Sequence, residues 1–111
     1  MPYDEELAAR VRTEMQTHGL PEEKRMFGGL AFLLRGHLAV CVSHDGGLLV
    51  RTDGTESVEL LTQEHVDPMV MGRQESRTWL RVDAAGLATD DDLRTWIARG
   101  VTTAAALPPK R

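Results

Sequence analysis

The sequence predicts an α+β domain of two layers, in which a five-stranded antiparallel sheet carries helices on one face. The chain has 111 residues, of which 41% are hydrophobic and 27% charged, enough for one domain with one two-layer core. Apolar residues recur with helical spacing near both ends and in alternation between them. The predicted order of elements is therefore α-β-β-β-α-β-β-α.

The first helix is predicted over residues 4–18. Acidic residues at its start, Asp4 among them, favour the positive end of the helix dipole, and Gly19 gives a stop signal. Its apolar positions fall on one face: Leu7, Ala8, Val11 and Met15.

Three strands follow the first helix. Residues 22–24 are expected to be a solvated run, and alternation begins in residues 30–35. Gly36-His37 allows a tight reversal into residues 38–43, and the turn at 44–47 leads into residues 48–52. The second half of the sheet is expected to pair antiparallel in the same way.

A short helix is expected next, with Asp53 as its N-cap, Glu56 three residues later, and Val58 and Leu61 pointing inward. Because Pro68 cannot donate to a sheet ladder, the fourth strand is expected to begin after it, over residues 69–71. Residues 72–77 are expected to be a turn or loop, and residues 78–82 the fifth strand.

The last helix is predicted to begin after the cap Thr89 and to end before Pro108-Pro109. Gly100 lies on its apolar stripe, where the missing side chain lets another backbone approach closely. The stripe consists of Leu93, Trp96, Ile97, Val101 and Ala104. The single domain is expected to span residues 1–107, with a flexible tail at 108–111.

The two faces of the sheet are expected to differ. The side toward the helices would carry Leu30, Phe32, Leu34, Leu38, Val40, Val42, Leu48, Val50, Leu80 and Val82, and the other side Ala31, Leu33, Ala39, Cys41, Ser43, Leu49, Arg51, Trp79 and Arg81. The second set is too apolar for a solvated face, and aromatic residues with Arg are favoured in interface cores. We therefore expect this face to contribute to a homodimer or a contact with another protein.

The charge balance restricts the classes of partner. Lys and Arg number 13 against 17 Asp and Glu, which gives a net charge of −4. Direct nucleic-acid binding is not expected, because duplex binders usually carry a basic stripe. One cysteine, no apolar leader and no long apolar run favour a cytoplasmic protein without a membrane segment.

Candidate catalytic and metal-binding groups are few. Cys41 lies between valines with no adjacent cation, so a small structural cysteine is favoured over a nucleophile. His37 and His44 lie at opposite ends of one predicted strand, about 23 Å apart at ~3.3 Å per residue, and cannot share an ion there. A metal held by His44, Asp45 and a distant residue such as His65 stays open, but we expect no metal and no cofactor.

In His44-Asp45 and in His65-Val66-Asp67 a possible base lies near a carboxylate, as in catalytic sites where the carboxylate orients the histidine. The signal is weak, because neither pair has an identifiable nucleophile. No catalytic residue is assigned, and the chain is not expected to be an enzyme.

The stretch at residues 25–29, Arg-Met-Phe-Gly-Gly, is the most unusual of the sequence. Its two glycines favour a β-bulge or sharp bend into the sheet, with a ligand loop as the alternative. No helix begins there and no Gly-Lys-Ser/Thr follows, which excludes a P-loop.

Three segments carry a family resemblance: KRMFGGLAF at 24–32, GHLA at 36–39 and GLLVR at 47–51. They resemble the N-terminal domain of the TfoX/Sxy family. Tyr3-Asp4-Glu5-Glu6-Leu7, Pro68-Met69 with Gly72, and Trp79 with Val82 fit the same pattern. The Met-Phe-Gly-Gly step is its most specific part, and the match covers nearly the whole chain.

The resemblance implies an α-β3-α-β2-α domain like that of type III secretion chaperones, which are often dimers. Full-length TfoX proteins are regulators of natural competence that assist the cyclic-AMP receptor protein. Those regulators have a second, C-terminal TfoX domain, whereas this chain is expected to contain only the N-terminal one. The family supplies no catalytic residues to transfer.

We therefore expect a small, non-enzymatic regulatory or protein-binding module, with a protein partner and a homodimer. Its candidate interaction residues are Met26, Phe27, Gly28, Gly29, Leu33, Leu49, Arg51, Trp79 and Arg81. One alternative is a transcription co-regulator that contacts DNA directly or through a DNA-bound partner. Another is an enzyme or ligand binder with a site near Gly28, Gly29 and His44.

Overall fold

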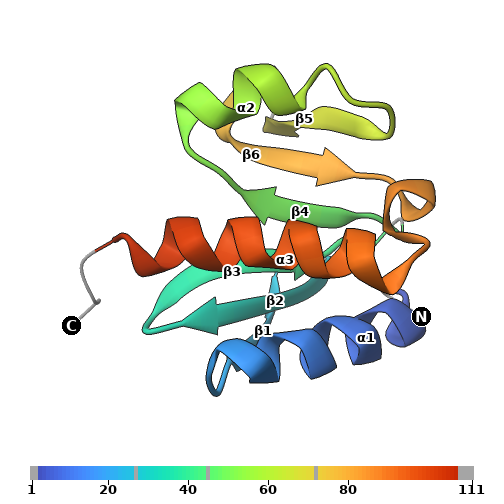
Figure 1. The fold of residues 1–111 in the computed structure, drawn as a ribbon, viewed down its shortest axis with the longest axis vertical. Coiled ribbons are helices and arrows are strands. Elements are labelled where there is room, and N and C mark those ends of the chain that lie inside the picture. The colour runs from blue at the N-terminus through green and yellow to red at the C-terminus, as the bar shows by residue number, and fades with distance from the viewer. Residues whose placement is uncertain (1–2, 27, 45, 72, 108–111) are drawn as a thin grey trace.

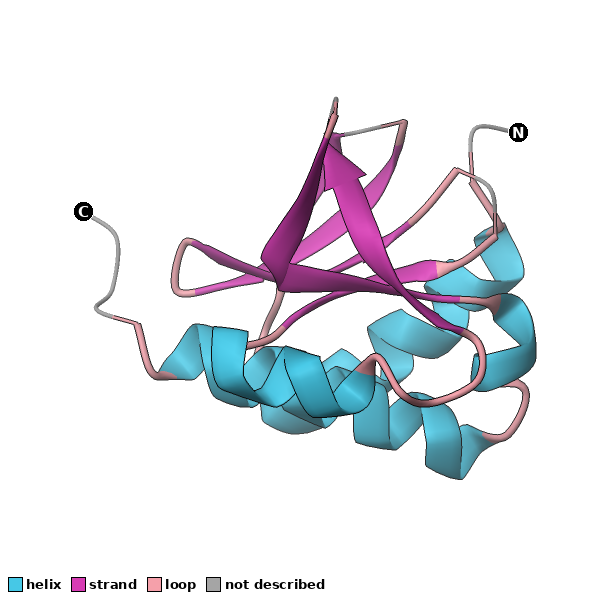
Figure 2. Cartoon of the chain, turned by 90° about the horizontal axis from the view of Figure 1, so that it is seen from above, coloured by secondary structure: helices cyan, strands magenta, loops and turns pink. Residues whose placement is uncertain are grey.

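The computed structural model describes residues 3–26, 28–44, 46–71 and 73–107, and the predicted tail at 108–111 lies outside them. The helices are α1 (Glu5–Met15), α2 (Gly54–Leu60) and α3 (Asp90–Ala105), with 3₁₀ turns η1 (Gln16–His18) and η2 (Ala84–Leu87). The strands are β1 (Glu22–Met26), β2 (Gly29–Leu34), β3 (His37–Val42), β4 (Leu48–Arg51), β5 (Val66–Met71) and β6 (Gln74–Val82). Helices lie on one side of a strongly twisted sheet (Figures 1 and 2).

The α+β class and the antiparallel pairing are confirmed, but the sheet has six strands rather than five. Its order is β1-β2-β3-β4-β6-β5, so the chain leaves β4, passes through α2 to the edge strand β5, and returns in β6 between the two. Two segments that are distant in the sequence, β4 and β6, therefore lie side by side within the sheet (Figure 1).

The extra strand is β1, where the sequence favoured a solvated run. It pairs antiparallel with β2 from Glu22 opposite Leu33 to Met26 opposite Gly29. As an edge strand β1 bears charged side chains on both faces, so apolar alternation could not reveal it. Arg12 of α1 holds the strand by donating from Nε and a terminal nitrogen to Glu23 at 2.7 and 2.9 Å.

A β-bulge in the hairpin of β2 and β3 changes which side chains face the helices. The register shifts between Phe32 and Leu33, so that Val40 faces Phe32 and Leu38 faces Leu33. The prediction that Leu38 faces the helices and Ala39 faces away is therefore wrong. Ala39 is buried in the main core, and Leu38 lies on the opposite face.

The main core lies between the helices and the sheet, and Gly100 of α3 sets how close they come. A Cβ atom at Gly100 would lie 2.6 Å from the Ala39 carbonyl oxygen and 2.8 Å from Val40 Cγ1. The predicted close approach of a backbone is confirmed. Thr89 caps α3 as expected, accepting at Oγ1 from the Asp92 amide at 3.0 Å.

The predicted short helix forms as α2, and the Glu56 amide donates to Asp53 Oδ1 at 2.7 Å. Its predicted inward residues are wrong. Val58 is 72% exposed and Leu61 37%, whereas Leu60 is buried at 5%. A helix of seven residues has too few turns for apolar spacing to choose its buried face.

The last two strands are longer than predicted. β5 begins at Val66 and includes Pro68, which an edge strand tolerates because its free side needs no amide donor. β6 begins at Gln74, so most of the predicted loop at 72–77 is strand, and Gly72 lies outside the described residues.

Candidate protein-interaction site

The sheet face away from the helices, here called the far face, encloses a second small core. Ala31 and Cys41 are fully buried there, and Leu33 and Leu49 are each 7% exposed. The half-buried side chains packed around this core are Met26, Leu38, Met69 and Trp79. Two predicted interaction residues, Leu33 and Leu49, thus lie inside the domain and support the side chains around them.

Arg51 and Trp79 lie directly opposite each other on β4 and β6. The Arg51 guanidinium carbon is 5.0 Å from the centre of the Trp79 ring, which is a cation–π contact. The two residues are 28 positions apart in the sequence, and the pairing of β4 with β6 brings them together. Alternation placed both on the far face, but not side by side.

The Arg51 side chain is half-buried, and its Nε atom is buried without a hydrogen-bond partner among the residues that the structure describes. Burial lowers the pKa of Arg51 from its usual value, because desolvation disfavours the charged form. In contrast, ion pairs with carboxylates are made by Arg10, Arg12, Arg81, Arg94 and Arg99. Arg51 therefore bears a charge that is partly removed from water and not matched by a carboxylate within the described part of the chain.

Arg81, another predicted interaction residue, is placed differently. Its terminal nitrogen forms an ion pair with Asp83, and Asp67 of β5 lies opposite it in the sheet register. The guanidinium also limits the space at Gly47, where a Cβ atom would come within 3.1 Å of it. Arg81 is therefore already engaged by its own chain.

The glycines of the unusual stretch turn the chain from β1 into β2. Gly28 has a φ of +74°, and a Cβ atom at Gly29 would lie 1.9 Å from the Val42 carbonyl oxygen. The sharp bend is confirmed, and these contacts account for both glycines. Gly28 also lies next to His44, since a Cβ atom there would be 3.5 Å from His44 Cβ. Phe27 lies outside the described residues.

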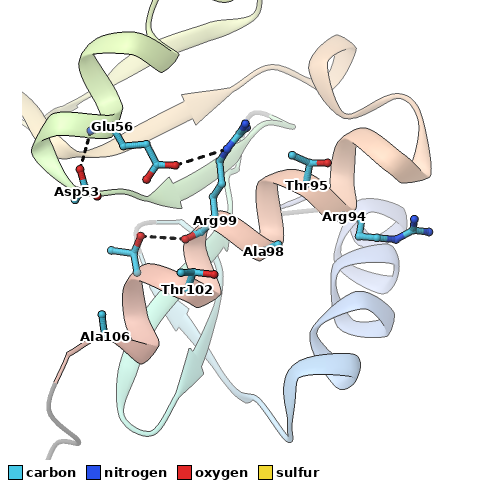
Figure 3. Close-up of a pocket in the computed structure, with 9 residues that line it drawn as sticks. Asp53, Glu56, Arg94, Thr95, Ala98, Arg99, Thr102 and Ala106 are labelled. Atoms are coloured by element: carbon cyan, nitrogen blue, oxygen red, sulfur yellow. Dashed lines mark hydrogen bonds and ion pairs between the residues drawn. The ribbon is translucent and has the colours of Figure 1, made fainter.

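A groove of about 650 Å³ between α2 and α3 is a second candidate surface, which the sequence did not indicate (Figure 3). Arg99 crosses it and forms an ion pair with Glu56, Nε to Oε1, at 3.7 Å. The Arg99 guanidinium carbon also lies 4.6 Å from the centre of the Trp96 ring. Because Glu56 already matches this cation, the groove offers a weaker chemical anchor than Arg51.

A comparison with protein families matches most of the chain. The model of the TfoX N-terminal domain matches residues 13–104. The chain belongs to the TfoX N-terminal domain family. No curated protein matches the chain.

In this TfoX N-terminal domain, Cys41 has the properties of a structural residue. Its side chain is fully buried, and burial raises the pKa of the thiol to about 11. A thiolate is therefore scarce at neutral pH, and the sulfur is shielded from reagents.

The histidines form no metal centre within residues 3–26, 28–44, 46–71 and 73–107. No group of three or more His, Cys, Asp or Glu side chains there could hold a metal ion. His65 Nε2 lies 4.0 Å from Glu64 Oε2, and both side chains are exposed. Asp45 of the His44-Asp45 pair lies outside the described residues. Among the described helices, none is long and apolar enough to span a membrane.

Proposed function

We propose that this TfoX N-terminal domain is a non-enzymatic regulatory module that binds a protein through its far face. The contact surface is the far-face rim, made of Met26, Leu38, Arg51, Met69 and Trp79. The observation that carries the proposal is the pair of Arg51 and Trp79, stacked at 5.0 Å with the Arg51 Nε lacking a partner among the described residues.

The composition of the rim supports a binding role. Trp and Arg are the side chains that most often dominate the energetics of protein interfaces, and Met adapts its shape to a partner. Beneath the rim, the buried residues Ala31, Leu33, Cys41 and Leu49 hold the strands in place. A rim on rigid strands loses little conformational entropy when a partner docks.

Affinity purification tests the proposal. The tagged chain is expressed at its native level, and proteins retained in near-stoichiometric amounts are identified by mass spectrometry. We expect Trp79→Ser to reduce retention of the partner at least tenfold. Val58→Ser is the matched control, because Val58 is an apolar side chain on α2 that is 72% exposed. The variants are compared only where circular dichroism shows native secondary structure.

The residue substituted in this test must lie outside the second core, so that the variant still folds. Leu33→Asp would place a charge where the side chain is 7% exposed, so a loss of binding would only report unfolding. If Trp79→Ser fails to fold, Leu38→Ser removes another half-buried side chain of the rim. Equal retention by wild type and a folded rim variant would contradict the proposal.

The homodimer and the protein partner expected from the sequence stay predictions. Light scattering of the purified chain tests the first, since a monomeric mass would contradict it. Direct DNA contact is the second candidate of the sequence analysis, and the net charge of −4 weighs against it. Salt-sensitive nanomolar binding to duplex DNA in an anisotropy assay would favour that alternative.

A further inference from the structure

We propose that Arg51 binds a carboxylate of another polypeptide, presented in a segment whose neighbouring side chains are apolar. The inference rests on the proposed function, because it assigns a chemical role to one residue of the far-face rim.

Arg51 lacks a partner within the described part of its own chain. Its Nε is buried and has no hydrogen-bond partner in the described ranges. Because this end of the guanidinium is desolvated without a partner, the charge costs stability, and an acceptor at the accessible terminal nitrogens would offset that cost. The unmatched Arg51 charge lowers the stability of the isolated domain and lies on a candidate binding surface. A ligand that pairs with the charge would explain why it is there.

The Trp79 ring restrains the Arg51 side chain. The guanidinium carbon lies 5.0 Å from the ring centre, a cation–π contact. A guanidinium held this way donates in its own plane, and a carboxylate accepts two parallel N–H bonds in that geometry. The second core and its rim, with Leu38 and Met69, provide apolar surface on the same face for the side chains that flank the carboxylate.

Another polypeptide fits this face better than a second copy docked face to face. Among the far-face side chains that the structure describes, two carboxylates already have cations: Glu22 Oε2 lies 3.9 Å from Lys24 Nζ, and Asp83 forms an ion pair with Arg81. Asp67 lies opposite Arg81 in the register of β5 and β6. A second copy that presents this same face would have to break these interactions first.

The surroundings of Arg51 favour a carboxylate over a phosphate group. Phosphate sites in proteins usually combine several cations or backbone amides. Among the far-face cations that the structure describes, Arg81 on the next strand is engaged by Asp83, and Lys24 lies near Glu22. Arg51 is then the one guanidinium of these described side chains that no carboxylate matches. One planar cation between apolar side chains matches one planar anion.

Nuclear magnetic resonance of the whole chain tests the proposal through the Arg51 Nε–H signal, which Arg51→Lys assigns by removing it. The probe is acetyl-Leu-Asp-Leu-amide, and acetyl-Leu-Asn-Leu-amide is its uncharged match. We expect the signal to shift saturably with the Asp peptide and to stay unchanged with the Asn peptide. No shift with either peptide, or a shift with inorganic phosphate alone, would overturn the proposal.

A second variant separates binding from folding. Arg51→Met replaces the cation by an apolar side chain of similar length and should weaken Asp-peptide binding at least tenfold. It should leave the thermal midpoint unchanged or raise it, because an unmatched charge is removed. A lower midpoint would instead assign Arg51 a structural stacking role and overturn the proposal. Arg73→Met, at an exposed arginine between β5 and β6, should leave peptide binding unchanged.

Partner capture distinguishes this proposal from the proposed function. Loss of the partner in both Trp79→Ser and Arg51→Met supports both. If Trp79→Ser loses the partner and Arg51→Met retains it, the proposal that Arg51 binds a carboxylate is overturned, and the proposed function stands. Retention in both folded variants overturns the proposed function as well.

Discussion

Arg51 and Thr52 follow each other at the end of β4, and each has a buried polar atom without a hydrogen-bond partner among the described residues. Neighbouring residues of an extended chain point to opposite faces, so their consequences differ. Arg51 reaches the far face, where its Nε is buried but its terminal nitrogens are open to an acceptor from a ligand. Thr52 is 1% exposed, and no ligand can reach its hydroxyl without opening the core.

Replacing Thr52 by Val should therefore stabilise the domain. The two side chains have nearly the same shape, and the change removes a hydroxyl that lost its hydration on folding, which is worth about 1 kcal/mol. Chemical denaturation measures the free energy of unfolding. Thr78→Val, at an exposed position of β6, is the control and should stay within about 0.5 kcal/mol of wild type. A less stable Thr52→Val would mean that the hydroxyl has a partner.

The thiol of Cys41 gives a prediction about alkaline pH. Burial raises the pKa of the folded thiol to about 11, above that of an unfolded thiol. Below both values the thiol is protonated in either state, and its titration changes nothing. As the pH rises through the unfolded pKa, the unfolded chain releases a proton that the folded chain retains. This thiol therefore lowers the free energy of unfolding by up to about 1.4 kcal/mol per pH unit, until the pH reaches the folded pKa.

Comparing wild type with Cys41→Ala between pH 8 and about 11 isolates this effect, because all other groups titrate in both proteins. The free energy of unfolding of wild type, minus that of Cys41→Ala, should decrease as the pH rises. Native protein should also react with a thiol reagent far more slowly than unfolded protein. Equal rates would contradict a buried, protonated thiol.

At the scale of elements, the packing of α3 on β3 depends on Gly100. Gly100→Ala gains about 1 kcal/mol of helix propensity, but the new methyl group would lie 2.6 Å from the Ala39 carbonyl oxygen. Because a backbone atom cannot give way cheaply, we expect a net loss of about 2 kcal/mol or more in the free energy of unfolding. Thr102→Ala, at an exposed position of the same helix, should be neutral or slightly stabilising. Gain of stability in Gly100→Ala would contradict the close approach.

The orientation of α2 can be tested in the same way. Leu60→Ala should cost about 2–4 kcal/mol, because the side chain is 5% exposed in the main core. Val58→Ala should cost less than about 0.5 kcal/mol, because that side chain is 72% exposed. A larger loss in Val58→Ala than in Leu60→Ala would instead support the orientation expected from the sequence, with Val58 pointing inward. Thermal or urea unfolding of the two variants decides between them.

For the whole molecule, the features predicted well depend on local chemistry. Thr89 caps α3 as expected, accepting from the Asp92 amide. Asp4, expected to favour the helix dipole as an acidic residue at the start of the first helix, is the cap of α1 and accepts from the Leu7 amide. Helical spacing over many residues also identified the buried faces of these helices. The glycine at position 100 was predicted as a packing device, since its place on the buried stripe had no other physical reason.

The features predicted poorly depend on pairings distant in the sequence. β1 carries charges on both faces because only one of its edges is paired, so no apolar alternation revealed it. The bulge opposite Phe32 exchanged the faces of Leu38 and Ala39, and alternation assumes an unbroken register. The contact between Arg51 and Trp79 required the crossover that places β6 beside β4.

The far-face rim is proposed to be the surface that binds a partner. Hydroxyl-radical footprinting of the chain alone and with its captured partner tests it directly, because Met26, Met69 and Trp79 are reactive, half-buried side chains of the rim. We expect the partner to protect these three side chains, while the exposed side chains of Val58 and Leu61 near α2 keep their oxidation rates. Unchanged oxidation of the rim, with protection at the groove between α2 and α3, would contradict it.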